Sequence, residues 1–257
     1  MKIRFLGTGT STGVPQIGCK CPTCTSTDKH DKRTRASAIV TTDDGTNLLI
    51  DCGPDFYRQI LDAGSPRLDA LLVTHTHYDH VGGIDDLRPY SAQSENGFPA
   101  YCRADVDADL HNRIPYCFVQ HHYPGVPTFA IHDVVEGVPF RIGNTEILPV
   151  AIGHYKLRIL GYRIGALAYV TDCKTMPDET VEALRGVDTL VINALRRKEH
   201  MSHITLDQAL ELIRRIAPRR AYLTHLSHDM GTHADTEALL PPGVHIAYDG
   251  LEVVVGE

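Results

Sequence analysis

Four side chains of the kinds that bind metal ions stand close together in one histidine-rich motif. They are His75, His77, Asp79 and His80. Imidazole and carboxylate groups are the usual ligands of zinc, manganese and iron. Groups this close together would repel one another or need hydration unless a cation lay among them. The motif follows the apolar run 68–73, so it predicts a metal site on a loop at the end of a buried strand.

Three further candidates follow other strand-like runs of the sequence. They are His154 after residues 146–150, Asp172 after residues 168–171, and His225 after residues 221–224. If these strand ends meet at one edge, they pool seven ligand groups with the motif, which is too many for one tetrahedral ion. Two ions that share a carboxylate suit such a set. Asp172 is the natural bridge, because a carboxylate has two oxygens.

Two such ions define a chemistry. A hydroxide held between them would be a nucleophile at neutral pH, because coordination lowers the pKa of water from about 15.7 toward ~7. The ligand set therefore predicts a metal-dependent hydrolase. Nitrogen and carboxylate ligands suit zinc, manganese and iron alike, so the sequence leaves the identity of the catalytic ions open.

The elements that must position these residues are read from hydrophobic periodicity. Strands are expected at residues 2–6, 36–42, 47–51, 68–73, 99–102, 139–142, 146–150, 159–164, 168–171, 187–193, 221–224, 245–248 and 252–255. Helices are expected at residues 54–63, 105–112 and 205–217, and from within residues 82–90. This rhythm, without a low-complexity linker, predicts one compact α/β domain over residues 1–257. Two sheets packed face to face, with helices outside, fit the count.

Composition limits the classes of protein and partner. Hydrophobic content of 42% and charged content of 22% are ordinary for a soluble globular protein. No apolar run approaches the ~20 residues that a membrane span needs, and the N-terminus reads as a strand and not as a signal peptide. We therefore expect a cytoplasmic protein with no membrane partner. The net charge of −7 argues against nucleic acid as a partner, whereas bound divalent ions would still admit a small anionic substrate.

Two polar segments near the N-terminus have an open role. Residues 7–13 are rich in glycine but lack the ending of a phosphate-binding loop, so we expect backbone that passes close to another segment. Residues 25–35 are expected to form a solvated loop. Arg33 and Arg35 of this loop could reach an anionic substrate.

Two segments after the motif could contribute to the site. Arg88 could grip a phosphate, while Asp85 and Asp86 are expected to cap a helix and orient ligand histidines. Residues 113–127 are irregular and rich in aromatic residues and proline. They could form a lid or the contact of a homodimer. Two histidines of this segment show no metal spacing to the motif: His121 and His122.

The motif Thr74-His75-Thr76-His77-Tyr78-Asp79-His80-Val81-Gly82-Gly83 resembles the signature of the metallo-β-lactamase fold superfamily. The resemblance extends over nearly the whole chain, from residues 5–9 to residues 248–250. It implies a four-layer αβ/βα sandwich. It also implies one ion on His75, His77 and His154, a second on Asp79, His80 and His225, and Asp172 between them. It does not fix the substrate, because the fold hosts many hydrolytic reactions.

A narrower resemblance comes from three cysteines, Cys19, Cys21 and Cys24. They supply three thiolates, and a structural zinc wants a fourth ligand, which His228 offers three residues after His225. The chain has seven cysteines, an odd number that argues against a disulfide framework. Together with the histidine motif, these cysteines resemble those of the PhnP-like phosphodiesterases of the carbon–phosphorus lyase pathway, which have a similar cysteine cluster. Ordinary reduced cysteines in a tight turn are the alternative.

His203 stands just before the helix expected at residues 205–217. PhnP-like proteins, and the transfer-RNA 3′-processing nucleases of the same superfamily, have a non-ligand histidine at such a place. By that resemblance His203 would contact phosphoryl oxygens or protonate the leaving oxygen, and catalysis would depend on Asp79 and His203. The alternative is an exposed histidine at the start of a helix.

These inferences predict a metal-dependent phosphodiesterase that acts on a small cyclic or nucleotide-like phosphodiester. It would carry two catalytic divalent ions (zinc, manganese or iron) and one structural zinc. Three alternatives stay open: an RNA-processing nuclease of the same fold, a thioester or lactam hydrolase, and a metal-binding protein without turnover. RNA processing needs a basic arm or surface, which this chain lacks. Thioester or lactam hydrolysis gives His203 no special task.

Overall fold

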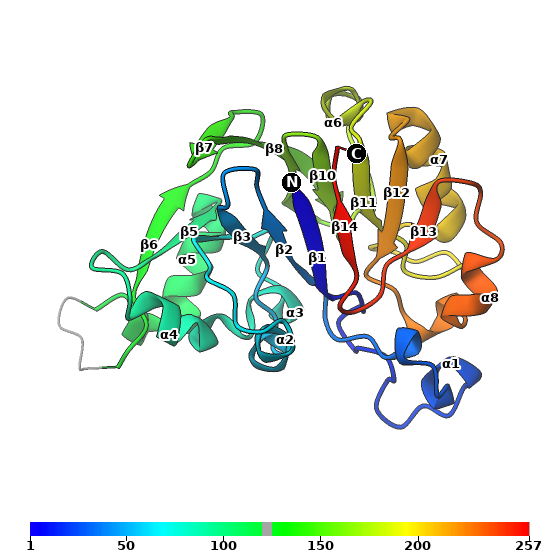
Figure 1. Ribbon diagram of the computed structural model, residues 1–257, viewed down its shortest axis with the longest axis horizontal. Helices are drawn as coiled ribbons and strands as arrows, with labels where there is room; N and C mark the ends of the chain where they lie inside the picture. The colour runs from blue at the N-terminus through cyan, green and yellow to red at the C-terminus, as the bar shows by residue number, and fades with distance from the viewer. Residues whose placement is uncertain (120–124, 257) are drawn as a thin grey trace.

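The computed structural model describes residues 1–119 and 125–256. Two sheets of seven strands each face one another across the middle of the molecule (Figure 1). The strand order is β14-β1-β2-β3-β4-β5-β6 in the first sheet and β13-β12-β11-β10-β9-β8-β7 in the second. Within these two ranges, no helix is both long and apolar enough to cross a bilayer.

The strands of each sheet are short and largely buried. The first sheet consists of β1 (Lys2–Gly7), β2 (Ser37–Thr41), β3 (Asn47–Ile50), β4 (Ala70–Leu72), β5 (Phe98–Cys102), β6 (Phe129–Asp133) and β14 (Glu252–Val254). The second consists of β7 (Phe140–Ile142), β8 (Thr145–His154), β9 (Leu157–Ile164), β10 (Leu167–Val170), β11 (Thr189–Asn193), β12 (Arg220–Thr224) and β13 (Val244–Ile246). Strands β3 to β6 run parallel, as do β10 to β13, so their carboxyl ends lie at one edge of each sheet.

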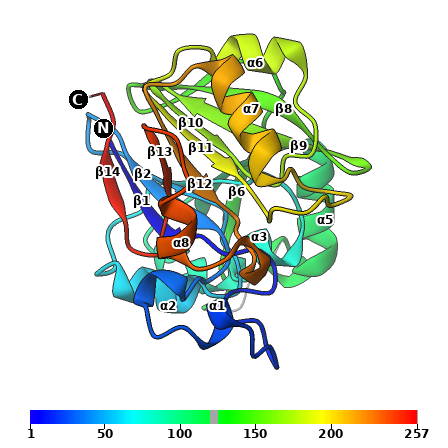
Figure 2. The ribbon, with the colours of Figure 1, turned by 90° about the vertical axis from the view of Figure 1, so that its right-hand side faces the viewer.

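Helices cover the outer faces of both sheets, whereas α1 lies at one end of the molecule, away from the sheet faces (Figures 1 and 2). The helices are α1 (Pro22–Thr25), α2 (Phe56–Asp62), α3 (Tyr78–Val81), α4 (Arg88–Ser91), α5 (Ala104–Arg113), α6 (Asp178–Leu184), α7 (Leu206–Ile216) and α8 (His233–Glu237). Short 3₁₀ turns lie at Lys29–Asp31, Ile84–Leu87, Pro115–Cys117 and His228–Met230. Helices α6 and α7 pack on the second sheet, and α2 and α5 pack on the first.

Alternation along the strands creates three apolar layers, because successive side chains of a strand point to opposite faces. In β3, Leu48 and Ile50 join the layer between the sheets, whereas Leu49 packs under α2 and α5. The second sheet has the same division, with Tyr169 facing inward and Val170 facing α6 and α7. The four-layer αβ/βα sandwich is therefore confirmed.

Helix α7 shows how the sequence sets an element that borders the site. Thr205 and Gln208 form a reciprocal capping box at its start, which satisfies backbone donors that the helix leaves free. The helix buries Leu206, Ala209 and Leu212 against the second sheet and ends at Ala217, which is left-handed. The cap fixes the point at which the preceding segment, residues 194–205, enters the helix, and His203 lies on that segment.

Several boundaries differ from the sequence-based expectations. Strand β8 continues to His154 instead of ending at Val150, because Gly153 lets the strand pass close to Thr175: a Cβ at Gly153 would lie 2.1 Å from the Thr175 hydroxyl. The sequence did not indicate β6, α6 or α8, and the helix expected within residues 82–90 is a 3₁₀ turn followed by the four-residue α4.

The two N-terminal segments have different outcomes. Residues 7–13 do pass close to another segment, because a Cβ on Gly7 would lie 2.0 Å from the carbonyl oxygen of Arg35. The solvated loop expected at residues 25–35 is wrong in part, since Asp31 and Arg33 are 2% and 6% exposed. The Arg33 guanidinium donates to the Thr8 hydroxyl and to a backbone carbonyl, so it braces the fold and does not face a substrate. His121 and His122 lie outside the described residues.

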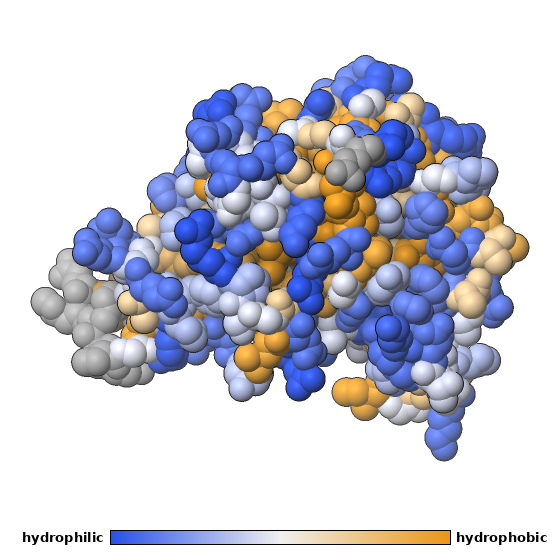
Figure 3. Space-filling view, viewed as in Figure 1, coloured by the Kyte–Doolittle hydropathy of each residue, from blue (hydrophilic) through white to orange (hydrophobic). Residues whose placement is uncertain are grey.

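The surface agrees with a core held between layers. Figure 3 shows hydrophilic residues over most of the face seen in Figure 1, with hydrophobic colour gathered near β14. Val254 of that strand is 45% exposed. Most large apolar side chains lie in the three buried layers, as expected for a globular protein of this length.

Candidate metal centre

The ends of four strands bring the predicted ligands together. The motif follows β4, Asp172 follows β10 by two residues, and His225 follows β12 directly. His154 is the last residue of β8, which runs in the same direction as β10 because both are antiparallel to β9. Ends that point the same way meet at one edge, so the structure gathers groups that lie up to 150 residues apart in the sequence, from His75 to His225.

Asp172 lies between two sets of possible ligands. One set, with His75, His77 and His154, places ligand atoms within 4.8 Å of one another and of Asp172. The second set, Asp79, His80 and His225, likewise places its ligand atoms within 4.8 Å of one another. The Asp172 carboxylate contacts both: Oδ2 lies 3.1 Å from His80 Nε2, and Oδ1 lies 3.4 Å from His225 Nε2 and 3.9 Å from His154 Nε2.

Backbone strain marks the same strand ends. Asp51, Asp172 and His225 adopt φ angles of 58°, 54° and 54°, in the left-handed region that favours glycine. Each such residue costs on the order of 1 kcal/mol and persists only where the surrounding structure enforces it. All three directly follow a strand or lie within two residues of its end, and two belong to the predicted ligand set. Residues strained in this way cluster at functional sites.

One buried carboxylate, Asp51, orients two of the ligand histidines. Its Oδ2 accepts from His80 Nδ1 at 2.7 Å and from the Thr74 hydroxyl at 2.8 Å. The Thr74 oxygen in turn lies 3.0 Å from His75 Nδ1 and can accept its proton. A carboxylate can only accept, so Nδ1 of His80 carries the proton and Nε2 presents a lone pair to the cluster. His75 is fixed in the same tautomer through Thr74.

A backbone carbonyl orients a third histidine. His154 Nδ1 donates to the Ser202 carbonyl at 2.8 Å, which again leaves Nε2 for the cluster. Ser202 precedes His203, and Ile204 donates to the carbonyl of Cys173 at 2.9 Å. The segment that carries His203 is therefore bound on both sides to residues of the predicted metal site.

The pattern of unpaired atoms tests whether a cation fits here. His75 Nε2, His80 Nε2 and His225 Nδ1 are buried polar atoms with no hydrogen bond. Buried polar atoms are normally paired, and leaving several of them unpaired in one place is costly. In His75 and His80 the other ring nitrogen, Nδ1, is fixed as a donor, so Nε2 presents a lone pair to the cluster. His80 Nε2 faces the carboxylates of Asp79 and Asp172. This donor set of nitrogen and carboxylate oxygen fits divalent ions such as zinc and could hold them.

Charge within the cluster shifts the pKa of its members strongly. Burial alone would raise the pKa of Asp172, but the charges of His225 and His80 hold it well below the usual range. Burial and the neighbouring His80 lower the pKa of His75 well below its ordinary value. Asp172 is thus ionised and His75 is neutral, which are the states that bind a metal ion. Burial opposes a charge on His80, but the charges of Asp172 and Asp79 raise its pKa well above the ordinary value, so His80 must release the proton on Nε2 when it becomes a ligand.

Two glycines let the motif pack against the end of β3. A Cβ on Gly53 would lie 2.1 Å from the Asp79 carbonyl oxygen, and one on Gly83 would lie 2.0 Å from the Gly53 carbonyl oxygen. Backbone hydrogen bonds hold the same contact: Cys52 donates to the His80 carbonyl at 2.7 Å, and Gly83 donates to the Cys52 carbonyl at 2.9 Å. Larger residues at these glycines would push the motif away from Asp51.

His203 lies beside the cluster and is 8% exposed. Its Nδ1 is 3.7 Å from Asp172 Oδ1, and its ring stacks on that of His225 with centroids 5.0 Å apart. Burial, followed by the charge of His225, lowers the pKa of His203 to about 3. Its Nδ1 is also within ligand range of a group with Asp172 and His225. The alternative of an exposed histidine is excluded, and His203 lies beside the predicted ligands.

A second cluster forms where the sequence predicts the structural zinc. Cys19, Cys21, Cys24 and His228 place their ligand atoms within 4.8 Å of one another. His228 Nδ1 lies 3.4 Å from the sulfur atoms of both Cys19 and Cys21. A hydrogen bond from the Cys24 backbone leads the causes that lower the pKa of Cys21 to about 6, so this thiol ionises readily. All seven cysteines are free, and these four groups fit a tetrahedral zinc site.

Other polar residues near the motif have structural partners. Asp85 accepts from the Tyr116 hydroxyl at 2.7 Å and from Arg88 at 2.8 Å. Asp51, and not Asp85, is therefore the carboxylate that orients His75 and His80, so the expectation for Asp85 is wrong. Arg88 also donates to the Gly125 carbonyl, and Arg35 pairs with Asp55 at 3.0 Å. The sequence analysis missed Asp51, whose one weak signal is that it follows a strand directly, much as Asp172 does.

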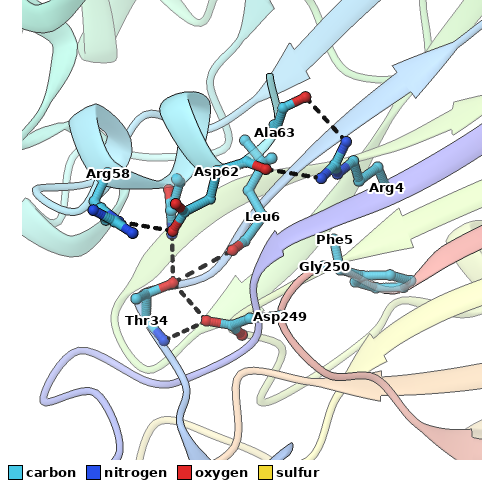
Figure 4. A pocket seen from close by; sticks show the side chains of 10 residues that line it. Arg4, Phe5, Leu6, Thr34, Arg58, Asp62, Ala63, Asp249 and Gly250 are labelled. Atoms are coloured by element: carbon cyan, nitrogen blue, oxygen red, sulfur yellow. Dashed lines mark hydrogen bonds and ion pairs between the residues drawn. The ribbon is translucent and has the colours of Figure 1, made fainter. Parts of the chain in front are cut away.

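A small polar pocket elsewhere serves the fold. It has a volume of about 150 Å³ and lies between β1, α2 and the loop around Asp249 (Figure 4). Arg4 donates to the carbonyls of Asp62 and Ala63 at 3.2 and 3.1 Å, and the Thr34 backbone donates to Asp249 at 2.7 Å. These contacts tie the end of α2 to β1, so most polar contacts of the pocket are made within the protein.

Comparison with known proteins gives one family. A family model described as a beta-lactamase superfamily domain matches residues 46–226, which include the motif, His154, Asp172 and His225. An octanoyltransferase of Porphyromonas gingivalis is 45% identical over 258 aligned residues, covering 100% of this chain and 52% of that protein. This chain therefore spans about half the length of that relative.

Solved structures show the same fold. A diphosphatase of the PhnP family superposes with a TM-score of 0.90 at 37% identity, covering 98% of this chain and 96% of that one. A zinc-bound PqqB from Methylobacterium extorquens superposes with a TM-score of 0.81 at 20% identity, covering 99% of this chain and 100% of that one. The second likeness shows the fold alone. The first confirms the resemblance to PhnP-like enzymes that the sequence predicts.

Proposed function

Because this chain belongs to the beta-lactamase superfamily, we propose that its metal centre hydrolyses a small phosphodiester, cyclic or nucleotide-like. The fold and the PhnP-family diphosphatase support a hydrolase. One observation carries the finer proposal: two sets of three ligands meet on the two oxygens of Asp172, with His203 beside them. A paired site of this kind suits in-line displacement at phosphorus, where attacking and leaving oxygens both need stabilisation.

The predicted ligands would form two separate sets, one for each ion. His75, His77 and His154 would hold one ion, and Asp79, His80 and His225 would hold the other, with Asp172 shared. Zinc, manganese or iron fits this donor set. Bound ions of this kind polarise phosphoryl oxygens and lower the pKa of water, so that hydroxide is available near neutral pH. A separate zinc on the cysteine cluster would have a structural role.

His203 would assist the leaving group. Its Nδ1 faces Asp172, which leaves Nε2 as the ring nitrogen that can approach a substrate. Asp172 Oδ1 lies 3.7 Å from this Nδ1, and the stacked ring of His225 restricts the tilt of the His203 ring. A negatively charged phosphodiester beside the ring would favour protonation at Nε2. Proton donation to a departing alkoxide would then follow as general acid catalysis.

The surroundings favour a small substrate. The chain carries a net charge of −7, so it lacks the excess of basic residues that long nucleic acids require. We propose a small diester as the partner and the cytoplasm as the location, because the cysteine cluster needs reduced thiols. The name of the octanoyltransferase relative makes acyl thioesters a necessary comparison, as the superfamily fold also suits acyl chemistry.

The test is a substrate panel with two ligand variants. The metal-loaded protein is assayed on bis(p-nitrophenyl) phosphate, a 2′,3′-cyclic nucleotide, a structured RNA, an octanoyl thioester and a lactam. We expect turnover of the phosphodiesters and near-total loss in Asp79→Ala and His80→Ala. His245→Ala is the control, since this histidine pairs with Glu237 and belongs to neither cluster.

Two results would contradict the proposal. Retained phosphodiesterase activity in both Asp79→Ala and His80→Ala would remove the metal centre from the reaction. A wild-type protein that hydrolyses only the thioester, the lactam or the RNA would keep the metal centre and replace the substrate class. No turnover of any substrate by a fully loaded protein would favour a metal-binding role.

A further inference from the structure

The hairpin between β8 and β9 carries a residue that its backbone does not favour. His154 and Leu157 form the last pair of the ladder, so Tyr155 and Lys156 make up the whole turn. Tyr155 has a φ of 53°, in the left-handed region. Two-residue hairpin turns of this kind normally place glycine, asparagine or aspartate at such a position. A bulky aromatic residue there is a genuine outlier.

The side chain of Tyr155 does not explain this choice by packing. It is 57% exposed and belongs to none of the three buried layers. The fold would tolerate glycine at this turn at least as well as tyrosine. Strain of this type persists where the surrounding structure or the function requires it, and it clusters at ligand sites.

The position of Tyr155 is next to the metal centre. It directly follows His154, whose Nε2 lies 3.9 Å from Asp172 Oδ1. The turn therefore begins one residue after a side chain that we assign to the metal centre. Lys156 lies on the same turn, with its Nζ 5.4 Å from the centroid of the Tyr155 ring. An aromatic ring and an ammonium group thus stand together on the turn that directly follows a predicted ligand.

We propose that Tyr155 and Lys156 form a substrate subsite that stacks a planar aromatic group of the phosphodiester. The subsite rests on the proposed phosphodiesterase function and narrows its substrate class to diesters that carry a nucleobase or an aryl group. The ring of Tyr155 supplies the stacking surface, because every base has a π-face that an aromatic side chain can meet. The ammonium of Lys156 attracts the negative charge of the same molecule.

The test compares two cyclic diesters that share the reacting five-membered ring. One is adenosine 2′,3′-cyclic phosphate, and the other is ethylene phosphate, which lacks the nucleoside. Tyr155→Gly should lower kcat/KM for the adenosine diester about tenfold or more, mainly through KM, and leave ethylene phosphate nearly unchanged. Tyr155→Phe keeps the ring and should retain the preference. Tyr57→Ala is the control, since Tyr57 is 64% exposed on α2 and flanks no ligand.

Stability separates this role from a structural one. Because glycine relieves the left-handed backbone, Tyr155→Gly should melt at the same temperature as the wild type or higher. A marked fall in Tm would show that the ring supports the fold and would overturn the subsite. An equal loss of kcat/KM on both diesters, or no loss on either, would overturn it as well.

A binding measurement keeps the subsite distinct from the proposed function. If the wild type hydrolyses neither diester, the phosphodiesterase proposal fails, and calorimetry with adenosine 2′-monophosphate and with inorganic phosphate still decides the subsite. We expect Tyr155→Gly to weaken binding of the nucleotide about tenfold or more and to leave phosphate binding unchanged. Equal nucleotide affinity in the two proteins would contradict the proposal.

Discussion

At the scale of single residues, hydrogen bonds on Nδ1 decide which nitrogen of His75, His80 and His154 faces the metal centre. Asp51 fixes His80 directly and His75 through the Thr74 hydroxyl. Partners of this kind set the tautomer and raise the basicity of a ligand, and their loss typically costs 10- to 100-fold in metal affinity. Asp51 thus acts on both proposed ions although it is not a ligand itself.

Replacing Asp51 tests this role. Asp51→Asn leaves an oxygen for one partner and turns an amide donor toward the other, so the tautomer of His80 is no longer fixed. We expect affinity for the catalytic ions to fall about 10- to 100-fold, measured by competition with a zinc-binding dye. Asp85→Asn serves as the control, because Asp85 pairs with Tyr116 and Arg88. Equal affinity in the two variants would remove Asp51 from this role.

The leaving group tests His203. We expect His203→Ala to lower kcat about 10²- to 10⁴-fold on a cyclic nucleotide, whose leaving alkoxide needs a proton. The loss should be much smaller on bis(p-nitrophenyl) phosphate, because p-nitrophenolate leaves without protonation. Metal content should stay at the wild-type level in the same preparation. An equal loss on both substrates would instead make His203 a donor to phosphoryl oxygens, and lost metal would make it a ligand.

The sequence predicts the ligand types well but not their supports. His75, His77, Asp79 and His80 are recognisable because four ligand groups within six residues are hard to explain otherwise. Asp51 has no such signal, since a single carboxylate after a strand has many ordinary uses. Its importance depends on Thr74 and His80 lying beside it, and only the parallel pairing of β3 with β4 brings them there.

At the scale of elements, a short backbone ladder connects the two clusters. Gly9 pairs with Leu226, Thr10 donates to the Leu226 carbonyl at 3.0 Å, and Leu226 donates to the Thr8 carbonyl at 2.9 Å. Leu226 lies between His225 of the metal centre and His228 of the cysteine cluster. A zinc ion on the cysteines would therefore hold both sides of this ladder: the N-terminal segment and the segment that follows β12.

The ladder predicts an effect at a distance. Cys21→Ser should lose the structural zinc and loosen the segment after β12, so that His225 is held less firmly. We expect lower kcat/KM for the phosphodiester and faster amide hydrogen exchange at Leu226. Lys20→Ser is a close control, because Lys20 is exposed and lies between two cysteines of the cluster. Unchanged turnover in a Cys21→Ser protein that lacks the zinc would contradict the coupling.

Element boundaries were predictable where the apolar pattern is regular. Helix α7 and strands β2 and β3 agree closely with expectation, because their periodicity and caps are local signals. Strand β8 extends past Val150, whereas the sequence suggests an end there because Gly153 resembles a strand break. In the structure, glycine is needed at this position because the strand passes close to Thr175. Strand β6 was missed, since His132 and Asp133 interrupt its pattern and its pairing with β5 comes from distant residues.

At the scale of the whole molecule, the two sheets explain why one site can use ligands from both halves of the chain. The motif belongs to the first sheet, whereas His154, Asp172 and His225 belong to the second. The apolar layer between the sheets sets their distance, so packing far from the site holds the two ligand sets against Asp172. The architecture was predictable from the count of strands, and the family match over residues 46–226 agrees with it.

Counting metal ions per chain tests this arrangement most directly. We expect three metal equivalents in the tag-free wild type, two in Cys21→Ser and one in Asp172→Ala, because loss of the shared carboxylate should release both catalytic ions. Elemental analysis of folded protein, checked by circular dichroism, gives these numbers. An Asp172→Ala protein that keeps all three ions, or a wild type that binds only the ion of the cysteine cluster, would contradict a dinuclear centre built on Asp172.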